Sequence, residues 1–177
     1  MTKEIPINHK GEVLYALCDD EDYPLLSRHC WYIRSATSGV IYATTTLMAN
    51  IGQRKLVYMH NMILPGDGVD HISRNKLDNR KENLRKATYQ QNGWNKGKNK
   101  SVRGKPASSQ YKGVIRCVGA KGNVYWRIIF RLSKKGEKPE RFVRRGPFTT
   151  EIEAAKVYNE EVLKHRGEWA WLNPIPL

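Results

Sequence analysis

Hydrophobic and polar residues alternate over short stretches in the first third of the chain, with the period of two that is typical of β-strands. Apolar and β-branched residues gather in three stretches, at residues 12–17, 40–45 and 55–60. Because such residues favour pleated, half-buried positions, we expect a strand at each stretch. Acidic residues at 19–22 predict a turn after the first strand, and Pro-Gly-Asp-Gly at 65–68 predicts another after the third. Residues 1–58 are therefore predicted to form a β-rich segment.

A second pattern lies between residues 69 and 95. Val69-Asp70-His71 precedes a polar loop, and the short segment Leu84-Arg85-Lys86-Ala87 follows that loop. Thr88 and Gln91 have the spacing of a capping box, in which two side chains satisfy the first backbone N–H groups of a helix, so we expect a helix to begin there. Residues 93–109 lack apolar periodicity and are rich in Gly, Asn, Ser and Lys, which predicts a linker or an extended arm.

The last third of the chain predicts a small α+β unit. Three further strand candidates lie at residues 114–118, 124–132 and 141–145. Turns that contain glycine separate them, which favours a three-stranded antiparallel sheet. Thr150 and Glu153 form a second capping box, and Gly167 is a natural C-cap, so a helix is expected between them. One stripe of this helix holds Ile152, Ala155, Tyr158 and Val162. A helix on one face of the sheet is the smallest packing that buries both.

Charge narrows the choice of partner. The chain has 177 residues, 31 of them Lys or Arg against 17 Asp or Glu, for a net charge of +14. Residues 83–136 hold no acidic residue at all, and aromatic residues are interspersed among their cations. A surface that served solubility alone would mix signs. Nucleic acid or an anionic membrane would match such a stretch, and the lack of a basic amphipathic helix favours nucleic acid.

The same composition bears on the compartment. No run of eighteen apolar residues occurs, and the N-terminus lacks the apolar stretch of a secretory signal. The three cysteines, Cys18, Cys30 and Cys117, are too scattered for a disulfide framework or a Cys-x-x-Cys zinc site. We therefore expect a soluble protein of a reducing compartment, the cytoplasm, with no membrane partner.

The candidate chemistry lies in Asp70-His71, Asn83 and Asn92. Hydrolysis of a phosphodiester needs a base for water, neutralisation of the phosphate and stabilisation of the leaving 3′ oxygen. Histidine is a base near neutral pH, and the hard oxygens of Asp70 and Asn92 suit Mg²⁺. Asp-His pairs and Asn-rich loops also occur as plain turn formers. His60, at the end of an apolar strand, reads as a packed or hydrogen-bonded structural residue.

Three stretches around these residues closely resemble HNH endonucleases, especially the homing type found in phages. They are Val69-Asp70-His71-Ile72, the segment from Lys76 to Arg85, and Ala87-Thr88-Tyr89-Gln90-Gln91-Asn92. The resemblance covers residues 59–95, with looser matches at residues 19–23 and Trp31. It implies a ββα-metal fold, a hairpin and a helix that hold one divalent ion, Mg²⁺ or Mn²⁺.

The resemblance also implies roles for single residues. His71 would be the general base, and Asp70 and Asn92 would be metal ligands. Asn83 would brace the loop and orient the histidine. The third motif position is Asn92 rather than His, a variant that keeps an oxygen ligand and favours the nicking of one strand. The gene would then be phage-encoded and the protein would act in the cytoplasm of a bacterial host.

The C-terminal part resembles the AP2 DNA-binding domain over residues 109–173. The match rests on Tyr111-Lys112-Gly113-Val114, Trp126, Gly146-Pro147-Phe148, the helix segment Glu153-Ala154-Ala155-Lys156-Val157-Tyr158-Asn159 and Gly167-Glu168-Trp169-Ala170-Trp171-Leu172-Asn173. It implies a sheet face that enters the major groove. The sequence departs from plant relatives at Ile115, Cys117 and Ile129, where those use polar or charged contacts. The alternative is a generic basic α+β module.

Two groups of cations are expected to contact double-stranded DNA. The sheet face would carry Lys112, Arg127, Arg131 and Arg144, and the basic linker would carry Lys96, Lys98, Lys100, Arg103 and Lys105. The predicted order is thus a β-rich segment at 1–58, an HNH motif at 59–95, a basic linker at 96–108 and an AP2-like domain at 109–177. We expect a metal-dependent DNA endonuclease that acts as a monomer. The alternative is a non-catalytic DNA-binding protein or regulator.

Overall fold

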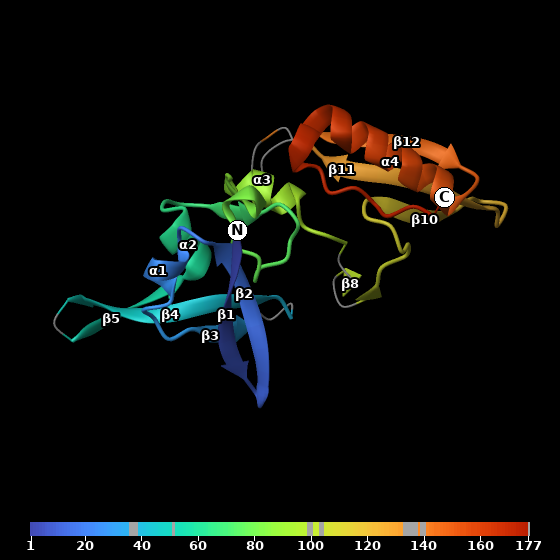
Figure 1. The fold of residues 1–177 in the computed structure, drawn as a ribbon. Coiled ribbons are helices and arrows are strands. Elements are labelled where there is room, and N and C mark those ends of the chain that lie inside the picture. Colours follow the sequence, from blue (N-terminus) through green and yellow to red (C-terminus); the bar gives the residue numbers. More distant parts are fainter. Residues whose placement is uncertain are drawn as a thin grey trace. The chain divides into compact units, whose positions relative to one another are not determined.

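The structure is a computed structural model that describes residues 1–35, 39–50, 52–98, 101–102, 105–132, 138 and 141–176. The chain forms two compact units, Met1–Asn92 and Gly93–Leu177 (Figure 1). Both are mixtures of strands and helices, as the α+β prediction requires. Among the described residues, no helix is long and apolar enough to cross a bilayer.

The first unit begins with an antiparallel hairpin, β1 (Thr2–His9) and β2 (Glu12–Asp19). Its turn residues Lys10 and Gly11 have φ of 52° and 87°, the positive values that a two-residue hairpin turn needs. Strand β2 confirms the strand predicted at 12–17. Apolar residues alternate along both strands, so one face of the hairpin is buried.

A second sheet follows the short helix α1 (Tyr23–Leu26). It contains β3 (Tyr32–Ser35), β4 (Ile41–Asn50) and β5 (Gln53–Tyr58) in antiparallel order. Strand β4 confirms the strand predicted at 40–45. The strand predicted at 55–60 ends at Tyr58, because helix α2 (Met59–Ile63) begins there. The placement of His60 on a strand was therefore wrong. Met59 and Ile63, which are four residues apart, both enter the core from this helix.

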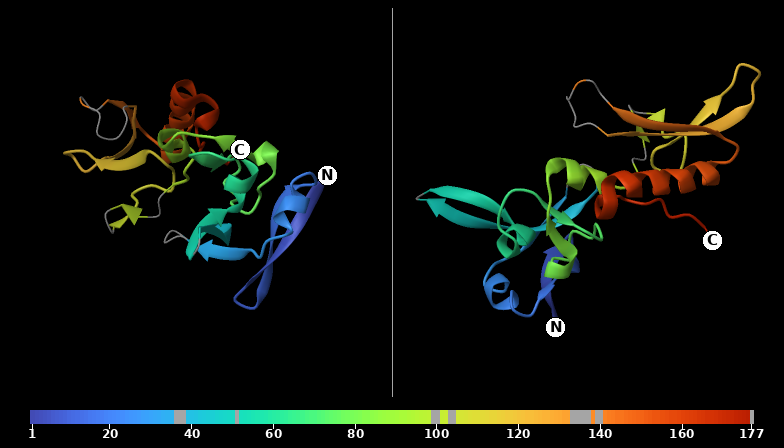
Figure 2. Two further views of the ribbon diagram at one scale, coloured as in Figure 1. Left: turned by 90° about the vertical axis from the view of Figure 1, so that its left-hand side faces the viewer. Right: turned by 90° about the horizontal axis from the view of Figure 1, so that it is seen from above.

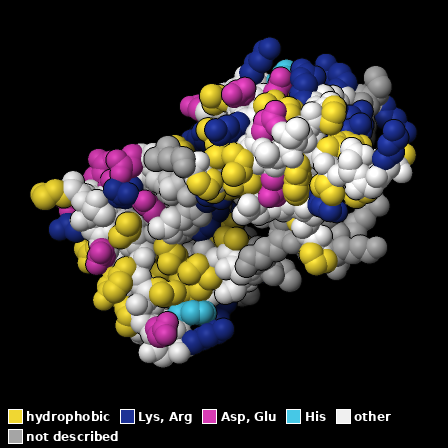
Figure 3. All heavy atoms as spheres, turned by 90° about the vertical axis from the view of Figure 1, so that its right-hand side faces the viewer, with side chains coloured by type: hydrophobic (Ala, Val, Ile, Leu, Met, Phe, Trp, Pro, Cys, Tyr) yellow, Lys and Arg dark blue, Asp and Glu magenta, His cyan; other side chains and the backbone are white. Residues whose placement is uncertain are grey.

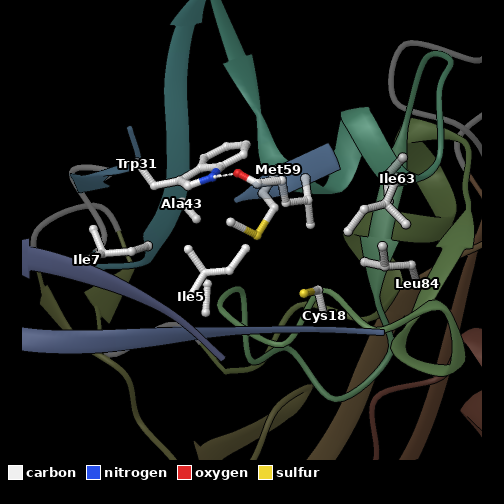
Figure 4. Close-up of a cluster of buried hydrophobic side chains, with 11 residues drawn as sticks. Ile5, Ile7, Cys18, Trp31, Ala43, Met59, Ile63 and Leu84 are labelled. Atoms are coloured by element: carbon white, nitrogen blue, oxygen red, sulfur yellow. Dashed lines mark hydrogen bonds between the residues drawn. The ribbon is translucent and has the colours of Figure 1, made fainter. Parts of the chain in front are cut away.

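One core joins the parts of the first unit (Figure 4). Its buried residues come from the hairpin, from the second sheet and from the HNH motif: Ile5, Ile7, Ala16, Cys18, Leu26, Trp31, Ala43, Met59, Ile63, Val69 and Leu84. Trp31 anchors the centre by donating from Nε1 to the backbone oxygen of Leu26 at 2.8 Å. Burial raises the pKa of the Cys18 thiol to about 11, so Cys18 packs as a small apolar residue. The core thus extends across the predicted boundary at residue 58.

The HNH motif forms the end of this unit. Strands β6 (Val69–His71) and β7 (Leu84–Lys86) pair antiparallel, a 3-10 turn η1 spans Lys81–Asn83, and helix α3 (Tyr89–Trp94) follows. The predicted capping box is present, since Gln91 N donates to Thr88 Oγ1 and Thr88 N donates to Gln91 Oε1. Gly68 has φ of 76°, and a Cβ there would lie 2.1 Å from the backbone oxygen of Ala87, so only glycine fits beside this strand pair.

The second unit has the predicted sheet and helix. Strands β10 (Val114–Val118), β11 (Val124–Arg131) and β12 (Phe142–Phe148) pair antiparallel in that order. Figure 2 shows helix α4 (Glu151–Arg166) lying along one face of this sheet. The shared core contains Tyr111, Val114, Ile128, Phe130, Val143, Ala154, Ala155, Tyr158 and Val162. Thr150 caps the helix by accepting from Glu153 N, as predicted. Ile152 was wrongly placed on the buried stripe, because the first turn leaves it 43% exposed.

The predicted linker contains more structure than its composition indicates. Two short strands, β8 (Ser101–Val102) and β9 (Lys105–Pro106), pair antiparallel within it. Just before them, the Arg166 guanidinium lies over the ring of Trp94, 5.3 Å from its centroid. A short 3-10 turn, η2 (Gly167–Trp169), ends helix α4. The predicted linker or extended arm therefore contains a short strand pair that the lack of apolar periodicity did not indicate.

Candidate active site

Strand β6 places Asp70 and His71 in the interior of the first unit. Both residues are 1% exposed. In the strand pair, Asp70 lies opposite Arg85, and His71 lies opposite Leu84. A buried carboxylate and a buried imidazole in consecutive positions are costly unless polar partners surround them. The contacts of each side chain show how they are accommodated.

The His71 ring is fixed by Asn79. His71 Nε2 lies 3.2 Å from Asn79 Oδ1, and Asn79 Nδ2 donates to the backbone oxygen of Leu77 at 3.1 Å. The Leu77 carbonyl can only accept, so the amide end that faces His71 is the oxygen. His71 Nε2 must then carry the hydrogen, and Nδ1 is the nitrogen of the neutral ring that can accept a proton.

Burial keeps this imidazole neutral. Burial first, and the charge of Lys76 second, lower the pKa of His71 to about 4, although the Asn79 hydrogen bond acts in the opposite direction. A second imidazole, His60, packs edge-on against His71 with 5.0 Å between the ring centroids. Tyr58 stacks on the other side of His60 at 5.3 Å, and burial lowers the pKa of His60 to about 3. His60 is 9% exposed, in keeping with the structural role expected of it.

Asp70 lies between two cations. Arg85 donates to Asp70 Oδ2 from Nη2 at 3.2 Å and from Nε at 3.3 Å, and Lys76 Nζ is 3.7 Å from Oδ1. The side chains of both cations are 14% exposed, so their charge is concentrated near the carboxylate rather than screened by water. Two cations around one carboxylate leave a net positive site, which favours the approach of a phosphate.

Asn92 reaches the same strand from helix α3. Its Nδ2 donates to the backbone oxygen of Val69, the residue before Asp70, at 3.5 Å. The amide oxygen, at the other end of this group, would be the ligand atom. The described residues contain no group of three His, Cys, Asp or Glu side chains that could bind a metal. The donors are instead a carboxylate and an amide oxygen, a set that fits Mg²⁺ or Mn²⁺ when phosphate and water complete the coordination.

Asn83 braces the loop between the two strands. Its Oδ1 accepts from Ser73 N at 2.8 Å, and its Nδ2 donates to the Asp78 backbone oxygen at 2.7 Å. These contacts link the backbones of Ser73 and Asp78, and the catalytic role implied for Asn83 stays a prediction. The hydrogen-bond acceptor for the His71 ring, however, is the amide oxygen of Asn79, a residue to which no sequence motif pointed.

The N-terminal hairpin holds the same loop. Leu17 N donates to Leu77 O and Asn79 N donates to Leu17 O, both at 2.8 Å. Asp19 Oδ2 accepts from Lys81 N at 2.7 Å. Strand β2 therefore holds the backbone of Leu77 and of Asn79, the two residues that position the contact with His71. The acidic turn at 19–22 was the only sequence signal for this brace.

The predicted DNA-binding residues divide into three groups. Arg127, Arg131 and Arg144 lie together on the sheet face opposite helix α4. Arg127 stacks on Tyr125 at 5.2 Å, while Arg131 and Arg144 stack on Phe142 at 5.4 and 5.0 Å. Figure 3 shows Lys and Arg side chains gathered over the C-terminal unit.

Lys112 has a different position from the one predicted. Its Nζ donates to the backbone oxygens of Trp94 and Lys96, at 2.9 and 2.5 Å, and lies over the Trp171 ring. Its placement among the cations of the sheet face was wrong, because its ammonium group donates to two backbone carbonyls at the start of the second unit.

The remaining cations belong to the predicted linker. Lys96 is exposed, and Lys98 is half-buried, with its pKa lowered by burial. Lys105 lies in β9. Lys100 and Arg103 lie outside the described residues. The structure therefore brings together the three arginines of the sheet, but not the whole predicted set.

Comparisons with known proteins identify the family of the chain. Residues 53–94 match the HNH endonuclease family. The chain is also 30% identical over 172 residues to an uncharacterized HNH endonuclease of Acanthamoeba polyphaga mimivirus, covering 94% of this chain and 78% of that protein. No solved structure matches the chain. The chain belongs to the HNH endonuclease family, whose members act on DNA and typically use a divalent metal.

Proposed function

We propose that this protein is a metal-dependent DNA endonuclease that hydrolyses phosphodiester bonds at the Asp70-His71 site. The observation that carries the proposal is the fixed, neutral ring of His71, with Nδ1 as its proton acceptor. Asp70 precedes it on the same strand, and the Asn92 amide lies against that strand. A base, two oxygen ligands and nearby cations are the groups that phosphodiester hydrolysis requires.

Each residue of the site has a separate proposed role in the hydrolysis. His71 Nδ1 takes a proton from the attacking water, and the Asn79 contact keeps that nitrogen unprotonated beforehand. Asp70 and Asn92 would hold the divalent ion, which when bound neutralises the phosphate and stabilises the leaving 3′ oxygen. Lys76 and Arg85 balance the charge of Asp70. Asn83 keeps the loop in the shape that presents Asn79.

We assign the choice of DNA site to the second unit as an AP2-like domain. The support is its three-stranded sheet with one covering helix and its row of stacked arginines. The described residues of each chain hold one candidate site, so we propose that a monomer nicks one strand. The protein would be phage-encoded and act in the cytoplasm of a bacterial host.

Incubation with supercoiled plasmid tests this proposal. With Mg²⁺ or Mn²⁺ the full chain should convert supercoiled DNA to nicked circles, and EDTA should stop the conversion. A gel-shift experiment in EDTA measures DNA binding separately. Binding without cutting under every metal condition would refute the endonuclease and favour a non-catalytic DNA-binding protein.

A further inference from the structure

The outer face of the C-terminal sheet has an apolar centre. Ile115 and Cys117 on β10 and Ile129 on β11 are each half-buried on this face. The register pairs Ile115 with Arg127, and Ile129 with Arg144. Together they line a shallow hollow of about 260 Å³. Its floor is therefore apolar, and exposed arginines stand beside it.

The arginines at the rim have restricted positions. Arg127 lies over the Tyr125 ring, and Arg144 lies over the Phe142 ring at 5.0 Å. Stacking on an aromatic ring limits the directions that a guanidinium can take while leaving its N–H groups able to donate. The hollow thus presents an apolar floor between two oriented cationic groups.

This combination fits one surface of DNA. The arginines at the rim favour a polyanion. The side chains of Ile115 and Ile129, by contrast, have no groups that could form hydrogen bonds with the polar edges of bases. The 5-methyl group of thymine is the apolar group that the major groove displays. A phosphate held against the floor would lose water without gaining a partner.

We propose that the hollow formed by Ile115, Cys117 and Ile129 recognises thymine 5-methyl groups in the major groove, with Arg127 and Arg144 contacting guanine edges or phosphates beside them. This proposal rests on the proposed function of the second unit in DNA binding. It predicts a preferred site with one or more thymines at its centre.

The test uses the full chain with the His71→Ala substitution, so that DNA is not cut. Selection from random duplexes gives preferred sites, and each thymine in the best site is then replaced by deoxyuridine, which lacks only the methyl group. At one to three positions the affinity should fall roughly three- to fivefold per methyl group. Replacement at the other thymines should have no effect.

Two variants link this effect to the hollow. Ile129→Ala should remove the discrimination between thymine and deoxyuridine, whereas Ile152→Ala, an exposed isoleucine on α4, should keep it. Thermal unfolding verifies that both variants fold, and Ile115→Ala serves in place of Ile129→Ala if the latter does not. If the protein binds a preferred site but no replacement of thymine by deoxyuridine changes the affinity, thymine recognition alone is overturned. Absence of DNA binding would overturn the proposed function as well.

Discussion

The Asn79→Ala substitution tests the orientation of His71, the proposed general base. The side chain of Asn79 is fully buried and makes two hydrogen bonds, to His71 Nε2 at 3.2 Å and to Leu77 O at 3.1 Å. Alanine removes both and leaves His71 able to rotate or to change tautomer. The backbone bond from Asn79 N to Leu17 O is kept, so the loop stays attached to strand β2.

The structure sets the size of the effect. A positioned general base contributes about 10²–10⁴-fold to a rate, and loss of a residue that orients such a group costs about 10–100-fold. We therefore expect the nicking rate to fall by about 10–100-fold. Two buried groups lose a partner, so the free energy of unfolding should fall by about 1–3 kcal/mol, within the ~5–15 kcal/mol of a typical domain.

Single-turnover nicking of supercoiled plasmid at saturating enzyme measures this rate without a contribution from DNA affinity. Asn75→Ala is the matched control, because it removes an exposed amide from the same loop, one that accepts from Leu77 N. It should nick at nearly the rate of the unmodified protein. If folded Asn79→Ala protein nicked as fast as Asn75→Ala, the assignment of His71 orientation to Asn79 would be refuted.

Three further predictions concern stability and the metal. The folded pKa values of His60 and His71, about 3 and 4, lie below the unfolded value near 6.5. The contribution of these two neutral rings to the free energy of unfolding is therefore fully present above pH 6.5 and is lost as the pH falls toward 4. The loss should reach roughly 3–4 kcal/mol at pH 5, and urea unfolding of His60→Phe should show about half of it; identical pH curves would contradict the burial of two neutral rings. Lys112→Met should lower the free energy of unfolding by about 1–3 kcal/mol, because two backbone carbonyls lose their donor. Arg127→Met should instead weaken DNA binding at an unchanged melting temperature. If Lys112→Met weakened DNA binding without lowering stability, Lys112 would belong to the DNA-binding surface after all. Asp70→Asn should raise the Mg²⁺ concentration needed for half-maximal nicking and weaken Mn²⁺ binding in calorimetry, whereas unchanged values in both would remove Asp70 from the metal site.

The sequence predicts features whose causes are local. Both helix caps, at Thr88 and Thr150, follow from side chains three residues apart. The box at Thr88 is reciprocal, whereas at Thr150 the Glu153 carboxylate accepts from the backbone N–H of Thr149 instead. The three strands of the second unit follow from alternation and glycine turns. The Asp70-His71 pair was recognisable because its motif is contiguous along the chain.

The features that the sequence could not reveal depend on distant contacts. Asn79 and Asn75 are alike in a polar loop, and only the fold directs Asn79 toward His71. The brace from Asp19 to Lys81 joins residues 62 positions apart. Lys112 resembles any other cation of a basic segment until its contacts with two backbone carbonyls are known.

The central claim is that His71 is the base of a metal-dependent DNA cleavage site. The most direct test compares single-turnover nicking by the unmodified chain and by His71→Ala in Mg²⁺ or Mn²⁺, at protein concentrations that give equal DNA occupancy. We expect the rate of His71→Ala to be lower by about 10²–10⁴-fold, with unchanged DNA affinity. Nicking by His71→Ala at the unmodified rate, or metal-independent nicking by both proteins, would contradict it.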